Sequence, residues 1–178
     1  LSRTAFLHAS DMVSFMRDYD VEDMGEEGGG SDRGRGRRGR GGDFRIENFV
    51  QKGQELLVQI TKEPISTKGP RVTSEISIAG RYLVMVPDDN HVRVSKRISD
   101  WGEKKRLRQI VRKLRPEGFG FIIRTEAIGR NENDFKVDIK RLHKFWIQLK
   151  KRADRLEPPA LLHQEMGMVT GIIRDVYS

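Results

Sequence analysis

Apolar and polar residues alternate in one segment of the chain and give way to β-branched residues in the next. Leu56, Val58 and Ile60 alternate with polar neighbours, as a half-buried strand requires. Residues 71–78 are rich in β-branched side chains, which favour strands. Two prolines and a glycine within residues 64–70 enforce a loop between these segments. The pattern therefore predicts a β-hairpin.

Beyond Gly80 the pattern alternates between strands and helices. Strands are predicted over residues 82–86, 92–98 and 119–125, with turn residues after the first of them. A helix is predicted between the second and the third strand, and a longer helix follows the third. This order indicates the α+β class.

Both predicted helices show a continuous apolar face and identifiable ends. Asp100 can cap the first helix, with Glu103 completing a capping-box-like pair. Pro116 ends that helix, and Pro158 with Pro159 ends the second. The apolar face of the first helix comprises Leu107, Ile110, Val111 and Leu114, and that of the second comprises Ile139, Leu142, Trp146, Leu149, Ala153 and Leu156.

Composition sets one segment apart from these elements. Residues 18–43 contain few large apolar side chains and cannot bury enough surface to fold alone. We expect a flexible insertion there, over about residues 20–43. Its arginines either contact nucleic-acid phosphates as an auxiliary, sequence-tolerant surface or simply face water, and both interpretations stay open. These side chains are Arg33, Arg35, Arg37, Arg38 and Arg40.

Charge and composition narrow the function classes. Lys and Arg number 34 against 26 Asp and Glu, and the resulting net charge of +8 favours an anionic partner such as nucleic acid. The chain has no cysteine, which excludes disulfides, thiolate metal sites and a cysteine nucleophile. No apolar run approaches the roughly 20 residues that cross a bilayer. We therefore expect a soluble, cytoplasmic protein without a membrane segment.

Two pairs of residues could bind nucleic acid. Phe6 could stack on a base and Lys68 could pair with a backbone phosphate, although alone the first is more often a core residue and the second solvated. Arg124 and Thr125 follow an apolar strand, and a guanidinium beside a hydroxyl can hold a terminal phosphate. In isolation, an exposed ion pair at Arg124 is the simpler interpretation.

The sequence shows no catalytic or metal-binding constellation. The four histidines lack a recurring metal-ligand spacing. His163 with Glu165, or Asp134 with Asp138, could form acid/base pairs, but charged residues at such positions usually face solvent. No phosphate-cradling glycine motif joins a strand to a helix. We therefore expect neither catalytic residues nor metal ligands in this chain.

Several short motifs, taken in order, carry a family resemblance. They are AFLH at 5–8, GQELLVQITKE at 53–63, TKGPRVT at 67–73, ISIAGRYLV at 76–84, IIRT at 122–125, PPALLHQE at 158–165 and IRD at 173–175. Each is weak alone, but their order along almost the whole chain resembles the ribonuclease E/G family. The resemblance omits only the expected insertion at about residues 20–43, which is rich in Gly and Arg and is called the Gly/Arg-rich insertion below.

The resemblance implies a domain order. Residues 1–79 would form part of an OB-fold RNA-binding β-barrel, and residues 80–173 a sensor of the 5′ monophosphate of RNA. Residues 174–178 would begin a following, truncated domain. The fold implied is α+β, a partial OB barrel followed by an α/β sensor domain with a long amphipathic helix.

The resemblance also implies residue roles. Phe6 and Lys68 fall on RNA-channel positions. Arg124 and Thr125 fall on the pair that grips the 5′ phosphate. The positions lining that pocket correspond to Gly80, Val84 and Lys96. The family most often has Arg where this chain has Lys96, so a planar bidentate contact is lost at that position.

At the level of the intact protein, the resemblance implies a metal-dependent, single-strand-specific endoribonuclease of RNA processing and decay. That enzyme would use Mg²⁺, act on single-stranded RNA with a 5′ monophosphate, and assemble as a homo-oligomer. The aspartates that hold the metal are missing here, so this chain is expected to capture RNA and not to cut it.

Two other hypotheses compete with an endoribonuclease. One is a non-catalytic, single-stranded-RNA-binding or scaffold protein. The other is a DNA-binding regulator, which is weaker because the basic segment 104–115 has an apolar face better suited to packing than to a groove.

Overall fold

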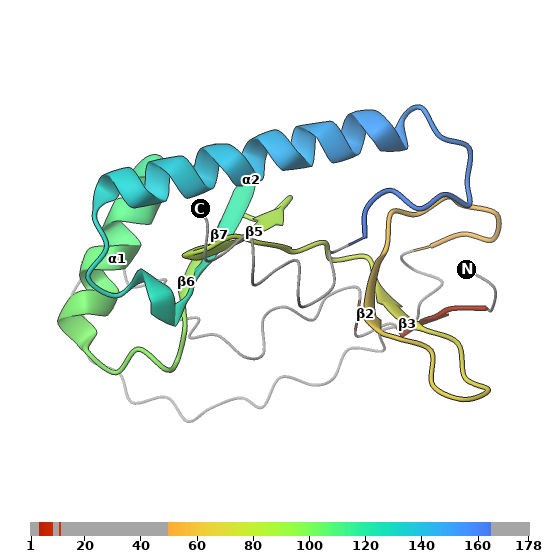
Figure 1. The fold of residues 1–178 in the computed structure, drawn as a ribbon, viewed down its shortest axis with the longest axis horizontal. Helices are drawn as coiled ribbons and strands as arrows, with labels where there is room; N and C mark the ends of the chain where they lie inside the picture. The colour runs from red at the N-terminus through yellow and green to blue at the C-terminus, as the bar shows by residue number, and fades with distance from the viewer. Residues whose placement is uncertain (1–3, 9–10, 12–49, 165–178) are drawn as a thin grey trace, which may run out of the picture. The chain divides into compact units, whose positions relative to one another are not determined.

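The computed structural model describes residues 4–8, 11 and 50–164 (Figure 1). They form two β-sheets and two α-helices, which confirms the predicted α+β class. The chain divides into two compact units after Leu142, and each is described by itself. Within the described ranges, neither helix has the length and apolar character needed to cross a bilayer.

The first sheet has three strands in the order β1-β3-β2. β2 and β3 pair antiparallel, which confirms the predicted hairpin, and β1 pairs parallel with β3. The described strands do not close into a barrel, so the OB-fold expectation is not confirmed. The strand bounds are Phe6–Leu7 for β1, Gln59–Lys62 for β2 and Arg71–Thr73 for β3.

The apolar alternation over residues 56–60 predicted the wrong buried face. β2 begins only at Gln59, and Leu56, Val58 and Ile60 are 39%, 38% and 40% exposed. The inward position is taken by Gln59, whose amide donates to the carbonyl of Ser77 at 3.2 Å and accepts from its N–H at 2.8 Å. These two non-local hydrogen bonds fix the side of β2 that turns inward.

The second sheet has four strands in the order β4-β5-β7-β6. β5 pairs antiparallel with β4 and with β7, whereas β6 and β7 run parallel. The segment predicted as one strand over 71–78 is divided between the two sheets, and the strand predicted over 92–98 ends early. The bounds are Ile78–Ala79 for β4, Leu83–Pro87 for β5, Val92–Val94 for β6 and Phe119–Ile123 for β7.

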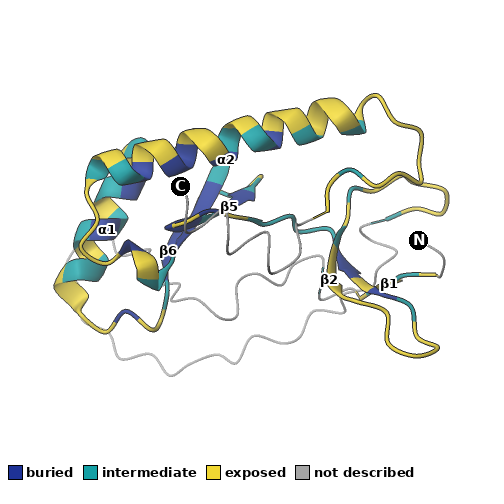
Figure 2. Ribbon diagram, viewed as in Figure 1, coloured by how far each residue is buried: buried dark blue, intermediate teal, exposed yellow. Residues whose placement is uncertain are grey.

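The helix α1 (Trp101–Leu114) is the crossover that parallel neighbours require, and it packs against β6 and β7. Asp100 accepts a hydrogen bond from the N–H of Glu103 at 3.1 Å, which confirms the predicted cap. Leu107 and Val111 are fully buried. Figure 2 shows this burial on α1 and on the central strands β5 and β7. Each such side chain contributes about 1.5–3 kcal/mol when it leaves water.

The helix α2 (Glu132–Ala153) is the longest element. Its first half buries Phe135, Ile139 and Leu142. Phe135 meets the ring of Tyr82, in the loop before β5, edge to face at 6.2 Å. The helix ends at Ala153, earlier than predicted, and Leu156 lies outside it and is exposed. Its last turn is rich in Lys and Arg, which suits a helix C-terminus.

Candidate functional site

One edge of the second sheet gathers the ends of three strands. Val94 and Ile123 are partners at the carboxyl ends of the parallel strands β6 and β7, and Leu83 at the start of β5 also pairs with Ile123. The N–H of Ser95 donates to the carbonyl of Ile123 at 2.9 Å, so the chains leave both parallel strands together. Ligand sites of α/β sheets lie at such carboxyl ends. This edge is therefore the candidate site.

The guanidinium of Arg124 is anchored at this edge by backbone carbonyls. Its Nη1 donates to the carbonyl of Gly80 at 2.7 Å and to that of Arg81 at 3.2 Å. The N–H of Arg124 donates to the carbonyl of Tyr82 at 3.0 Å. The side chain nevertheless remains 39% exposed. Arg124 is thus fixed in direction and open to solvent.

A buried carboxylate supports the loop that anchors Arg124. Asp138 on α2 is 4% exposed and accepts hydrogen bonds from the backbone N–H groups of Arg81, Tyr82 and Leu83 at 3.2, 2.9 and 3.1 Å. The N–H groups of this loop therefore bind Asp138, while its carbonyls at Gly80 and Arg81 bind Arg124. Asp138 acts as a positioning residue and does not form the acid/base pair with Asp134 that was considered from sequence.

Gly80 is required by this same carboxylate. A Cβ at position 80 would lie 2.6 and 2.7 Å from the two carboxylate oxygens of Asp138, closer than real side chains approach. The predicted pocket residue Gly80 therefore has a packing role beside the carbonyl that it presents to Arg124. Val84 is half-buried in β5 and pairs in register with Ala79 and Ile122.

Thr125 joins Arg124 at the edge, and a third residue contacts both. Thr125 begins the short 3₁₀ turn η4 (Thr125–Ala127). Its hydroxyl donates to Oε2 of Glu126 at 3.2 Å, and Nε of Arg124 lies 3.4 Å from the same oxygen. The predicted pair is therefore brought together with a carboxylate that sequence reasoning missed. An acidic residue directly after Arg-Thr was the available signal.

Further cations lie on the segments that adjoin this sheet edge. Lys96 and Arg97 follow β6 and are exposed. The guanidinium carbons of Arg81 and Arg130 lie 5.4 and 5.2 Å from the centre of the Tyr82 ring, as cation–π pairs. We call Arg81, Lys96, Arg97, Arg124 and Arg130 the cationic edge. Gathered cations raise the local concentration of anions.

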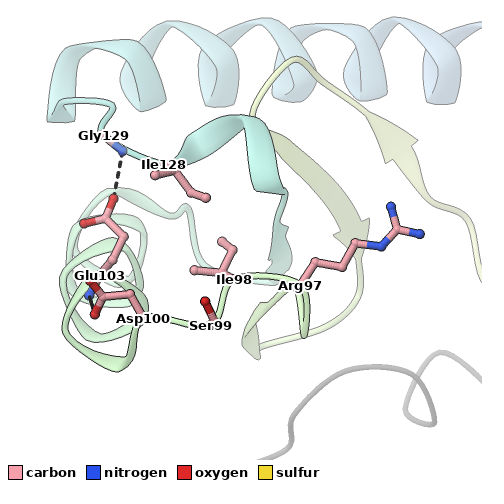
Figure 3. A pocket seen from close by; sticks show the side chains of 7 residues that line it. All are labelled: Arg97, Ile98, Ser99, Asp100, Glu103, Ile128 and Gly129. Atoms are coloured by element: carbon pink, nitrogen blue, oxygen red, sulfur yellow. Dashed lines mark hydrogen bonds between the residues drawn. The ribbon is translucent and has the colours of Figure 1, made fainter.

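A shallow pocket beside α1 is acidic and structural (Figure 3). Glu103 accepts from Nε and Nη2 of Arg106, both at 2.7 Å, and from the N–H of Gly129 at 2.8 Å. Arg106 and Gly129 together lower the pKa of Glu103 to about 2. Two nitrogens of Arg106 also donate to the carbonyl of Arg130 at 3.1 Å. This arrangement, the Glu103–Arg106 clamp, fixes the turn after η4 to α1.

The clamp also corrects one sequence prediction. Glu103 does not complete a reciprocal capping box with Asp100, because its carboxylate is occupied by Arg106 and Gly129. Arg97 extends away from Asp100 and Glu103 in Figure 3. The acidic wall of the pocket does not suit an anion, so this pocket is not part of the candidate site.

In the first sheet the structure sets Phe6 beside the loop that carries Lys68. Phe6 is 58% exposed and so is not a core residue, which was the simpler alternative for it, and its N–H donates to the carbonyl of Pro70 at 2.8 Å. A Cβ at Gly69 would lie 3.6 Å from the Phe6 ring and 1.8 Å from the carbonyl oxygen of Thr4. Only glycine permits that approach. Lys68, the preceding residue, is exposed.

Two largely buried carboxylates among the described residues are engaged by protein groups. Asp89 pairs with the buried Arg93 and with His91, and Asp138 holds backbone N–H groups. Within the described part of the chain, no three His, Asp or Glu side chains could hold a metal ion together. These residues therefore do not fit the Mg²⁺ that the resemblance implies, and no metal-dependent step is assigned to them. The five arginines of the Gly/Arg-rich insertion lie outside the described residues.

Comparison with known proteins shows similarity to one protein family and to several ribonucleases. Residues 77–178 match the model of the ribonuclease E/G family. The chain is 32% identical to Ribonuclease G of Escherichia coli and 33% identical to that of Haemophilus influenzae, in each case over 98% of this chain and 33% of the relative. It is 39% identical to Ribonuclease E of Nostoc sp. over 74% of this chain and 19% of the relative. The matches thus span a third or less of these relatives' length.

Proposed function

Because the chain belongs to the ribonuclease E/G family, we propose that its cationic edge binds the 5′ monophosphate of single-stranded RNA. Arg124 and Thr125 grip the terminal phosphate. The chain thereby serves as the end-sensing part of an RNA-processing endoribonuclease. The observation that carries this proposal is which nitrogens of the Arg124 guanidinium already have hydrogen-bond partners.

Arginine grips an oxyanion most strongly through the edge formed by Nε and Nη2. Arg71 holds Asp11 in this way, at 2.7 and 2.5 Å, and Arg106 holds Glu103 at 2.7 Å from each nitrogen. Arg124 instead donates from Nη1 to two backbone carbonyls. Its Nε makes only the 3.4 Å contact with Glu126, and among the described residues Nη2 makes no hydrogen bond. The gripping edge of Arg124 is therefore available.

A terminal phosphate suits this edge better than an internal one. A phosphate monoester carries about −1.5 to −2 charges at neutral pH and three acceptor oxygens. An internal phosphodiester carries a single charge. The fork of Arg124, the hydroxyl of Thr125 and the exposed Lys96 supply cationic and neutral donors at one sheet edge. A 5′ hydroxyl has no charge for them to bind.

The first sheet contributes a second, end-independent contact in this proposal. The exposed ring of Phe6 stacks on a base, and Lys68 pairs with a backbone phosphate. Stacking of this kind is worth about 1–3 kcal/mol per base. Phe6→Ala is expected to weaken binding of RNA with either 5′ end by the same factor. A loss confined to one kind of end would contradict this role.

The intact protein is proposed to be a metal-dependent endoribonuclease acting on single-stranded RNA. The residues described here bind and orient the RNA end, and the cutting step belongs to other residues. The chain is therefore a specificity element in this proposal.

The test is binding of the 178-residue chain to a short single-stranded RNA with a 5′ monophosphate or a 5′ hydroxyl, in moderate salt. We expect tighter binding of the monophosphate, and Arg124→Ala should abolish this preference. Arg152→Ala, which removes the same charge from the exposed end of α2, should preserve it. Equal binding of both ends by the wild type, with a steep dependence on salt, would instead support a general RNA-binding or scaffold protein.

A further inference from the structure

Glu126 stands where an anion bound by Arg124 and Thr125 would stand. A single oxygen, Oε2, accepts from the Thr125 hydroxyl at 3.2 Å and lies 3.4 Å from Nε of Arg124. These are the two groups that the proposed function gives to the 5′ phosphate. A carboxylate and a phosphate cannot occupy one position, because both are negative and both need the same donors.

The backbone turn of η4 tethers Glu126 next to the site. The N–H of Ala127 donates to the carbonyl of Arg124 at 3.1 Å, and the N–H of Ile128 donates to that of Thr125 at 3.2 Å. Ala127 is fully buried and anchors the turn. The carboxylate therefore competes intramolecularly, at an effective concentration that a free anion does not reach.

The side chain of Glu126 is nevertheless free to leave. It is 52% exposed, and both of its contacts are longer than the 2.7 Å contacts in the Glu103–Arg106 clamp. Exposed ion pairs of this kind are weak, so an arriving phosphate of higher charge can displace the carboxylate into water. A 5′ hydroxyl gains nothing by displacing it.

We propose that Glu126 is a tethered competitor of the 5′ phosphate, which lowers the affinity of the sensor for monophosphorylated ends. This inference rests on the proposed function of Arg124 and Thr125 and adds a regulator to the same site. Removing the charge of Glu126 should strengthen binding of the monophosphate end. Binding of RNA with a 5′ hydroxyl should change only as much as it does for any other lost negative charge.

The experiment compares Glu126→Gln with Glu117→Gln in the full 178-residue chain. Glu117 is an exposed carboxylate just before β7, whereas Glu126 lies just after it, so the two substitutions change the net charge equally at opposite ends of one strand. Relative to Glu117→Gln, Glu126→Gln should bind the monophosphate RNA about two- to fivefold more tightly, the range of one exposed ion pair. The two variants should bind the hydroxyl RNA alike.

Arg124→Ala separates failure of this inference from failure of the proposed function. If Arg124→Ala abolishes the monophosphate preference but Glu126→Gln matches Glu117→Gln, the sensor stands and the competitor is rejected. A weaker preference in Glu126→Gln would also reject it, because Glu126 would then be holding Arg124 in place for the phosphate. If Arg124→Ala retains the preference, the sensor itself is rejected. In the double variant, Arg124→Ala with Glu126→Gln, the gain should vanish.

Discussion

Two arginine–glutamate pairs lie beside the second sheet, and they differ in how tightly the two side chains are held. In the Glu103–Arg106 clamp, two contacts of 2.7 Å join the side chains, and Nη1 and Nη2 of Arg106 also donate to the carbonyl of Arg130. In the pair of Arg124 and Glu126, the contact is 3.4 Å and the gripping edge of the guanidinium is loosely held. Among the described residues, the guanidinium of Arg106 donates four hydrogen bonds to protein groups, whereas that of Arg124 donates two, both from Nη1. In the proposed function, this difference leaves Arg124 able to bind a ligand and makes Arg106 structural.

Removing the support behind Arg124 should have the largest effect. Asp138→Ala leaves the N–H groups of Arg81, Tyr82 and Leu83 without their acceptor; the last two are buried, and each buried group costs about 1–3 kcal/mol. We expect the free energy of unfolding to fall by about 3 kcal/mol or more, as measured by urea denaturation. Asp138→Asn keeps an acceptor oxygen and should be intermediate. Equal stability of Asp138→Ala and the wild type would contradict the support role.

Replacing each arginine by lysine should separate the two pairs. Lysine keeps the charge but loses the planar fork. Arg124→Lys should reduce the monophosphate preference by about tenfold, equivalent to about 1.4 kcal/mol, with little change in stability. Arg106→Lys should reduce stability and preserve the preference. Paired binding and denaturation measurements on both variants decide the outcome, and a reversed pattern would exchange the roles assigned to the two arginines.

The smallest effect is expected from the pH dependence of the clamp. Arg106 and the Gly129 N–H hold the pKa of folded Glu103 at about 2, below its ordinary value of 4.5. Its contribution to stability is therefore present above pH 4.5 and is lost as the pH falls towards 2. Glu103→Gln should cost about 1 kcal/mol at pH 7, because Arg106 is partly exposed and the pair is screened. Denaturation at pH 7, 5 and 3 should show the difference from wild type shrinking at the lowest pH.

Local signals in the sequence predicted the helices well. Asp100 caps α1 because its carboxylate accepts from the backbone N–H three residues further on, and the apolar spacing of Leu107 and Val111 leaves one face to bury. In the first sheet, the buried face of β2 was predicted wrongly because non-local contacts determine it. The hydrogen bonds of Gln59 with Ser77 decide which face of β2 turns inward, and no pattern within residues 56–60 contains that information.

The candidate site likewise contains residues that the sequence pointed to and residues that only the three-dimensional contacts reveal. The resemblance selected Arg124 and Thr125, and the structure brings both to the sheet edge together with Gly80. Asp138 was misjudged as solvated, although it lies three residues after Phe135 and so falls within the buried stripe of α2. Glu126 was missed because its significance depends on the conformation of η4, which sequence spacing does not reveal.

The long connection between β1 and β2 has a consequence for how the chain can vary in length. β1 ends at Leu7 and β2 begins at Gln59, so the Gly/Arg-rich insertion lies in a connection between two strands of one sheet. The entropy lost when a chain segment is closed into a loop grows with the logarithm of its length, by about 0.6 kcal/mol for each doubling. Large insertions or deletions in this connection should therefore change the stability of the sheet little. A single methyl group at Gly69 or Gly80 should destabilise the fold, because it would clash with neighbouring atoms.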